Sequence, residues 1–187
     1  SLPESLYTNC VLWLPFPKAY TSTQYSFAVA RATNDVTISG AVWTNDAGGG
    51  MFFNSDDYIN PSRQLFNIYT NQDISYLFWI KKTTAATATE AVFGLIDGQY
   101  FNGCLYLSDG TFGWGIRDNA ALVKSFYYTM NHSNFTFVAM TKSTSLGKFT
   151  IYENGLFKTN NTTASLGNIF SAFISPIGAR NDNGIIK

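Results

Sequence analysis

Apolar and polar residues alternate in short runs along most of the chain, and the clearest run lies late in the sequence. Phe149 and Ile151 alternate with polar residues. The dipeptide Asn154-Gly155 follows, and Phe157 continues the apolar positions beyond it. A period of two is typical of a half-buried β-strand, and Asn-Gly is the dipeptide best suited to a type I′ turn. We therefore predict a tight antiparallel hairpin over residues 148–158.

Strand-like runs recur along the whole length and are separated by turn-forming residues, such as Asp97-Gly98 and Asp109-Gly110. No segment shows the sustained apolar stripe at a spacing of 3.6 residues that an amphipathic helix requires. The chain of 187 residues suits one domain, and it contains neither an internal repeat nor a linker. The pattern predicts a single all-β domain over residues 1–187.

Five landmarks occur in the order found in laminin-G-like domains of the concanavalin A-like lectin/glucanase superfamily, which the chain resembles. They are an opening apolar strand, a glycine-rich turn leading to Asp-Tyr-Ile, a Phe-Trp strand, the strand before the hairpin, and the hairpin paired with a later Ile-Gly-Ala-Arg. In order, they lie at residues 11–16, 40–59, 74–82, 135–141 and 148–181. The resemblance implies an antiparallel jelly-roll β-sandwich.

The sequence departs from the family pattern after residues 177–181. Family members usually continue with a last strand that closes a sheet beside the first strand, whereas this sequence ends at Lys187. One explanation is that the chain is truncated or incomplete. The other is that a neighbouring subunit or another domain completes the sheet, because an unpaired strand edge invites pairing with another chain.

Composition narrows the range of partners. Aromatic residues make up 17% of the chain and charged residues only 13%, compared with a usual charged share of about 25%. Basic and acidic residues balance at twelve each. Nucleic acids and anionic membranes both require a concentrated basic patch, so we expect neither partner. No apolar run approaches the roughly 20 residues of a membrane-spanning helix.

The acidic residues give no support for catalysis. Glutamate occurs only at Glu4, Glu90 and Glu153, and none is paired in sequence with another acid. Retaining glycosidases need two carboxylates about 5 Å apart, and the Glu-x-Asp-x-x-Glu strand of glucanases with this fold is missing. The only histidine, His132, lies among polar residues and is typical of a loop. We predict that the protein is not an enzyme.

Calcium is the one metal that the resemblance suggests. Many relatives hold Ca²⁺ through Asp, Asn and carbonyl oxygens in loops, which are the hard oxygen ligands this ion prefers. The resemblance places Asp35 and Asp182 in loops near the chain termini, and they are the candidate ligands. Turns also select such residues for their own hydrogen bonds, so a purely structural role is the alternative.

Glycan recognition uses flat aromatic faces together with groups that satisfy hydroxyls. The candidates are residues next to predicted turns, and each also has a core or turn interpretation. Phe112 and Trp114 share one strand face opposite Gly113 and Gly115, a pattern that also suits sheet packing. The predicted ligand-binding residues are Tyr100, Trp114, Arg117, Asp118 and Tyr127.

Cys10 and Cys104 are the only cysteines, and a disulfide and two buried thiols are equally consistent with their positions.

The sequence thus predicts a domain that binds rather than catalyses, located outside the cell, on a cell surface or on a virion surface. Two hypotheses remain. The first is a carbohydrate-binding or adhesion module whose partner is a glycan. The second is a structural or decoration protein of a virus or phage particle or a surface filament, completed by neighbouring subunits.

Overall fold

The predicted hairpin is present. In the computed structural model, the turn residues Asn154 and Gly155 have φ angles of 51° and 81°. These are the left-handed conformations that a type I′ turn requires, which explains the choice of Asn-Gly at this position. The two-residue turn pairs Glu153 with Leu156 and Tyr152 with Phe157, and the register shifts only beyond them, between Tyr152 and Ile151. Phe157 therefore faces away from the buried Ile151.

The structure describes most of the chain. The described residues are 24–26, 35–44, 50–54, 57–61, 66–82, 89–97, 100–118, 120, 123–130, 134–170, 174–182 and 185–186. The predicted opening strand at residues 11–16, together with Cys10 and His132, lies outside them.

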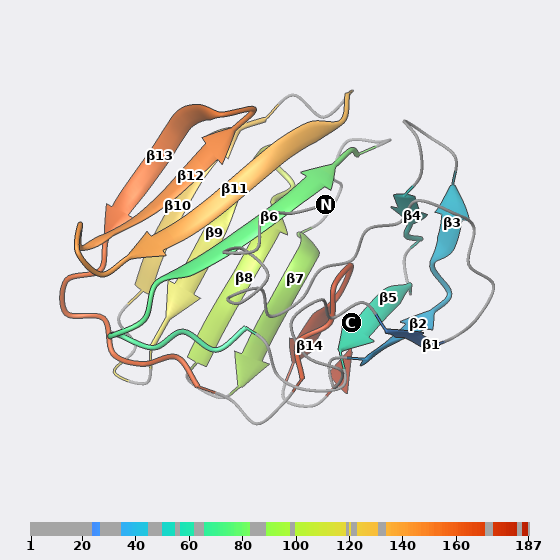
Figure 1. Cartoon of the computed structure of the whole chain (residues 1–187), viewed down its shortest axis with the longest axis horizontal. Helices are drawn as coiled ribbons and strands as arrows, with labels where there is room; N and C mark the ends of the chain where they lie inside the picture. The colour runs from blue at the N-terminus through green and yellow to red at the C-terminus, as the bar shows by residue number, and fades with distance from the viewer. Residues whose placement is uncertain are drawn as a thin grey trace.

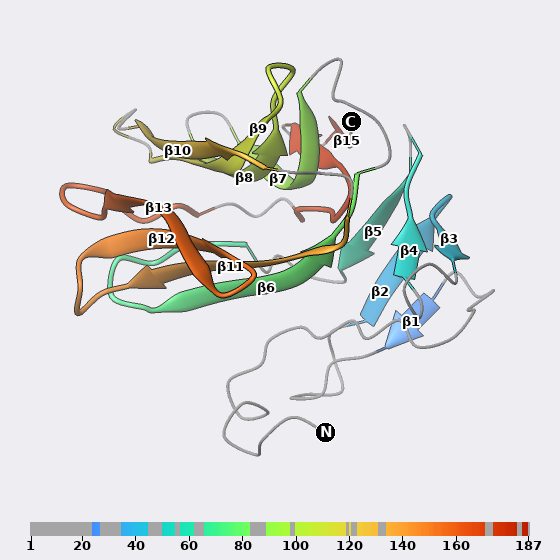
Figure 2. The same ribbon diagram turned by 90° about the horizontal axis from the view of Figure 1, so that it is seen from above.

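Two facing β-sheets form the body of the molecule (Figures 1 and 2). The smaller has the strand order β13-β12-β11-β6, and the larger has the order β10-β9-β8-β7-β14-β15. The strands of the smaller sheet are β6 (Ile74–Ile80), β11 (Thr136–Ser143), β12 (Lys148–Glu153) and β13 (Leu156–Thr162). Those of the larger sheet are β7 (Glu90–Asp97), β8 (Tyr100–Tyr106), β9 (Thr111–Arg117), β10 (Val123–Thr129), β14 (Arg180–Asp182) and β15 (Ile185–Ile186).

Two further small sheets lie beside this sandwich (Figure 1). One has the order β1-β2-β5, and the other pairs β3 with β4. Their strands are β1 (Gln24–Ser26), β2 (Asp35–Ser39), β3 (Val42–Thr44), β4 (Gly50–Phe52) and β5 (Tyr58–Pro61). Pairing between adjacent strands is antiparallel except between β14 and β7. The predicted all-β antiparallel sandwich is confirmed.

The predicted Ile-Gly landmark joins the small sheets to the sandwich. Ile177 forms bridges to Ile59 of β5 and to Phe93 of β7. Gly178 has a φ of 85°, and a Cβ at this position would lie 2.3 Å from the ring of Phe53. Only glycine fits both the left-handed conformation and this close approach.

The main core lies between the two facing sheets. Its centre is the Trp114 ring, which packs edge-on against Phe149 at 5.1 Å and Tyr76 at 5.4 Å between ring centroids. Such edge-to-face pairs add to the stabilisation from burial alone. Trp114 and Phe149 are fully buried.

The alternation along β6 separates an inner from an outer face. Tyr76 and Phe78 are partly buried and pack against the core, whereas Leu77 and Trp79 point outward. Within the described residues, there is no helix long and apolar enough to cross a membrane.

Candidate functional site

The outer surface of the four-stranded sheet carries large apolar side chains that no described residue covers. Leu77 is 62% exposed, Trp79 65% and Phe157 57%, and Phe137 and Tyr152 are half-buried beside them. The Trp79 and Phe137 ring centroids lie 5.4 Å apart, and those of Tyr152 and Phe157 lie 6.4 Å apart. We call these five residues the aromatic face.

Strand register arranges this surface in rows that run across the strands. Leu77 pairs with Ala139, Ala139 with Tyr152, and Tyr152 with Phe157. We call these four residues the apolar row. The Trp79–Phe137 pair lies two residues along the strands on one side of it.

A second row lies on the other side of the apolar row and consists of hydroxyl and amide side chains. Because alternate residues of a strand share a face and two residues span about 7 Å, this polar row runs parallel to the apolar row. By register, its members are Ser75, Thr141, Thr150 and Asn160.

Charges lie at the margins of this surface. The Lys81 ammonium stands over the Phe135 ring, 5.4 Å from its centroid, beyond Trp79. Lys148 follows the polar row on β12 and is exposed. The described outward positions of the four strands hold no carboxylate, and Glu153 instead forms an ion pair with Lys158 at 3.3 Å. The centre of the surface is therefore uncharged.

Trp114 lies in the core, contrary to its predicted ligand-binding role. It is fully buried, and its Nε1–H donates to Oδ1 of Asn102 at 2.7 Å. The glycines on either side of it face outward, and the rings of Phe101 and Tyr127 cover them. The alternative interpretation, sheet packing over glycine, describes this strand.

Asp118 is also buried, at 1% exposure, rather than presented to a ligand. Its Oδ2 accepts the N–H of Gly167 at 2.7 Å, and its Oδ1 accepts the N–H of Ala120 at 3.0 Å. The carboxylate thus ties the segment after β13 to the end of β9.

The other predicted ligand residues belong to the larger sheet. Tyr100 is half-buried and packs against the core. Arg117 and Tyr127 lie on the outer side of this sheet, where Tyr127 covers Gly113. Burial raises the pKa of Tyr127. The five predicted residues therefore do not converge on one site, and a ligand role for Arg117 and Tyr127 stays a prediction.

The two predicted calcium ligands lie in strands rather than in loops. Asp35 begins β2 and pairs with Ser26, and Asp182 ends β14 and pairs with Ile185. The described residues include no group of three or more His, Cys, Asp or Glu side chains placed to hold a metal ion. Calcium binding stays a prediction.

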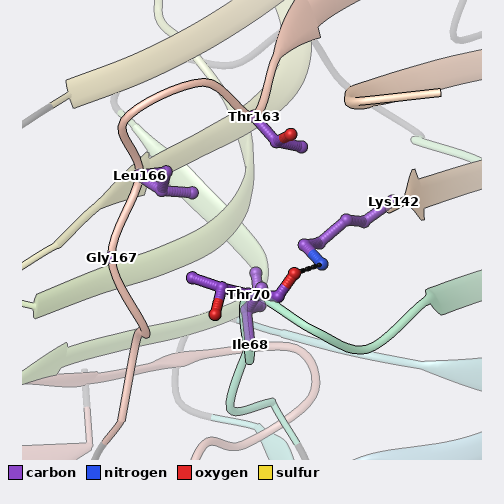
Figure 3. Close-up of a pocket in the computed structure, with 6 residues that line it drawn as sticks. All are labelled: Ile68, Thr70, Lys142, Thr163, Leu166 and Gly167. Atoms are coloured by element: carbon purple, nitrogen blue, oxygen red, sulfur yellow. Dashed lines mark hydrogen bonds between the residues drawn. The ribbon is translucent and has the colours of Figure 1, made fainter. Parts of the chain in front are cut away.

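A small cavity of about 40 Å³ lies beside the buried Lys142 (Figure 3). Its ammonium donates to the carbonyls of Thr70 at 3.1 Å and Gln72 at 2.5 Å. Burial lowers the pKa of Lys142, and the nearby Asp73 charge opposes this shift. A cavity of this size holds about one water molecule and cannot admit a sugar ring. We assign Lys142 a structural role, because it holds the turn before β6.

Sequence reasoning did not identify Trp79 as a surface residue. Residues 74–82 were recognised only as a strand landmark, because both alternating sets in β6 contain large apolar residues. A usable signal was the polar Ser75 and Lys81, which share the face of Trp79.

Three solved structures show the same fold. The binding domain of Paraclostridial Mosquitocidal Protein 1 has a TM-score of 0.67 at 14% identity, over 87% of this chain and 43% of that chain. The botulinum neurotoxin serotype D ligand-binding domain in complex with N-acetylneuraminic acid has a TM-score of 0.63 at 17% identity, over 78% of this chain and 38% of that chain. The third structure is domain 4 of AbnA, a GH43 extracellular arabinanase from Geobacillus stearothermophilus, in complex with arabinotriose. It has a TM-score of 0.62 at 19% identity, over 88% of this chain and 85% of that chain.

The chain spans about two fifths of the length of these toxin binding domains. No curated protein matches it in sequence. The three solved structures establish the lectin-like β-sandwich, but they do not single out the laminin-G-like group within it. A family model matches residues 27–182. Since this match covers most of the chain, the protein belongs to the family described as Clostridium neurotoxin, N-terminal receptor binding.

Proposed function

We propose that this chain is a non-catalytic carbohydrate-binding module that holds its ligand on the aromatic face. The observation that carries the proposal is the 65% exposure of Trp79 beside Phe137, with the polar row on the same surface. Sugars present C–H faces that pack on aromatic rings, and hydroxyls that bond to Ser, Thr and Asn side chains. This surface offers both kinds of group.

The fold neighbours support this class of ligand. One was solved with N-acetylneuraminic acid and another with arabinotriose, and these sugars are ligands of those proteins. Receptor binding, the role named in the family description, requires a location outside the cell, so we propose an extracellular or cell-surface protein. A laminin-G-like relationship is consistent with the order of the sequence landmarks and remains part of this proposal.

The proposal is tested by screening the protein on a glycan array and then measuring affinity for the best hit by calorimetry. Trp79→Ala should weaken binding about tenfold or more, which corresponds to about 1.4 kcal/mol. The matched control is Phe52→Ala, because Phe52 is an aromatic residue with 38% exposure on β4, outside the aromatic face. Unchanged affinity of Trp79→Ala would contradict the proposal.

A second candidate function is subunit packing in a particle or filament. The exposure of Leu77 and Trp79 also favours this function, because large exposed apolar patches mark protein contacts. Native mass distinguishes the two. A stable oligomer that Trp79→Ala dissociates would favour packing, whereas a monomer that binds glycan favours the module.

A further inference from the structure

We infer that the ligand is an extended, unbranched and uncharged glycan chain that crosses the four strands along the apolar row. The inference rests on the proposed function and adds the direction, the length and the charge of the ligand.

The direction follows from the row itself. Leu77, Tyr152 and Phe157 lie on three strands, with Ala139 of β11 between Leu77 and Tyr152. Adjacent strands are about 4.8 Å apart, so the row from β6 to β13 is about 14 Å long. A sugar unit in an extended chain advances by about one strand spacing. The row therefore offers one contact for each of four successive units.

The two flanking rows define the edges of this path. On one side, Trp79 and Phe137 present rings, and on the other side lie the hydroxyl and amide groups of the polar row. A chain along the apolar row turns one edge of every unit toward the hydrogen-bonding groups of the polar row, and the units over β6 and β11 turn the other edge toward Trp79 and Phe137. The short side chain of Ala139 leaves room for a unit between Leu77 and Tyr152. A branch on the polar edge of any unit would meet the polar row, and a branch on the other edge of the units over β6 and β11 would meet Trp79 or Phe137.

The charge of the ligand follows from the charges that surround the path. No carboxylate lies on the described outward positions of the sheet, Lys81 and Lys148 lie beyond the flanking rows, and the Lys158 charge is paired with Glu153. Lys81 stands over Phe135, and Lys148 lies past Thr150. Affinity for an uncharged chain should therefore change little with ionic strength, because screening acts on charge pairs.

The test uses linear arabino-oligosaccharides and cello-oligosaccharides of two to six units with the whole chain. Affinity should rise with length up to four units and then level off. Phe157→Ala should remove the gain in affinity from the fourth unit and leave the affinity for the shortest oligomers unchanged. Trp79→Ala should lower the affinity for oligomers of every length. Leu146→Ala is the control, because Leu146 is 72% exposed in the turn between β11 and β12, outside the row.

The outcomes separate the inference from the proposed function. If Trp79→Ala weakens binding but Phe157→Ala has no effect at any length, the chain does not cross the sheet and only the proposed function stands. An acidic oligomer that binds more tightly than the neutral oligomer of equal length, with an affinity that falls at high salt, would overturn the uncharged ligand. If no neutral or acidic glycan binds at all, the proposed function itself is lost.

Discussion

Two hydrogen bonds join Asn154 to Phe137. The backbone N–H of Asn154 donates to the carbonyl of Phe137 at 2.8 Å, and Oδ1 of Asn154 accepts the N–H of Phe137 at 3.0 Å. The residue that adopts the left-handed turn conformation thus also fixes the strand that carries Phe137 of the aromatic face. One sequence signal therefore contributes to both the hairpin and the candidate site.

We expect Asn154→Ala to lower the free energy of unfolding by about 2 to 3 kcal/mol. The left-handed backbone costs alanine about 1–2 kcal/mol, and the lost side-chain acceptor adds about 1 kcal/mol. Asn154→Gly keeps the left-handed conformation and should lose only the contribution of the side-chain acceptor, about 1 kcal/mol. Urea denaturation measures these changes, with the exposed Asn160→Ala as control. Equal losses for the Gly and Ala variants would show that the positive φ carries no cost.

Replacement of the two tryptophans should separate stability from binding. Trp114→Ala should destabilise the fold by about 3–5 kcal/mol, because it empties the centre of the core. Trp79→Ala should change stability by less than about 0.5 kcal/mol, as for other exposed positions, and should weaken glycan binding. Thermal unfolding and calorimetry test the pair. A large loss of stability in Trp79→Ala would place that ring in the core.

Asn102 should be among the most sensitive polar positions. It is fully buried, accepts from Trp114 Nε1–H, and donates to the Phe66 carbonyl at 2.5 Å. Asn102→Ala removes the acceptor of the buried Trp114 Nε1–H and the donor to the Phe66 carbonyl, and should cost about 2–4 kcal/mol, because a buried group that loses its partner costs about 1–3 kcal/mol. Chemical denaturation measures the change, with Ser145→Ala in an exposed turn as control. If Asn102→Ala lowered the free energy of unfolding by less than a typical surface substitution, a water molecule would have taken over the hydrogen bonds of the amide.

Asp118→Ala should destabilise the protein by about 1–3 kcal/mol, because it leaves the Gly167 N–H without its acceptor. Glycan affinity measured below the unfolding temperature should be unchanged. Asp118→Asn retains an oxygen acceptor and should recover part of the stability. A specific loss of affinity in a folded Asp118→Asn variant would restore the predicted ligand role.

Asp73 should contribute to the acid sensitivity of the fold. Its Oδ1 accepts the N–H and the hydroxyl of Thr144, each at 2.7 Å, and these bonds lower its pKa below the ordinary value of 3.8. Because the folded pKa is depressed, the stabilisation is present above pH 3.8 and is lost as the pH falls through the folded value. Asp73→Asn should therefore destabilise the protein at pH 7 and progressively less below pH 3.8. Urea midpoints across this range test the change, and a difference independent of pH would contradict it.

The local sequence was sufficient to predict the hairpin and its strands, but not the ligand-binding side chains. Phe149, Ile151 and Asn154-Gly155 predicted the hairpin because turn geometry and strand alternation depend on neighbouring residues alone. The same alternation did not locate the ligand-binding side chains. Trp114 and Asp118 were expected at a binding surface and are buried.

The sequence by itself determined an all-β chain, its hairpin, and the separation of Trp114 from Gly113 and Gly115 on opposite faces of one strand. Only the tertiary structure decided which face of each strand is covered. Trp114 is buried because residues of the smaller sheet, such as Phe149, pack against its side of β9, and Trp79 is exposed because it alternates along β6 with Tyr76 and Phe78, which face the core. Burial depends on contacts between residues far apart in the chain, and periodicity within one strand cannot specify them.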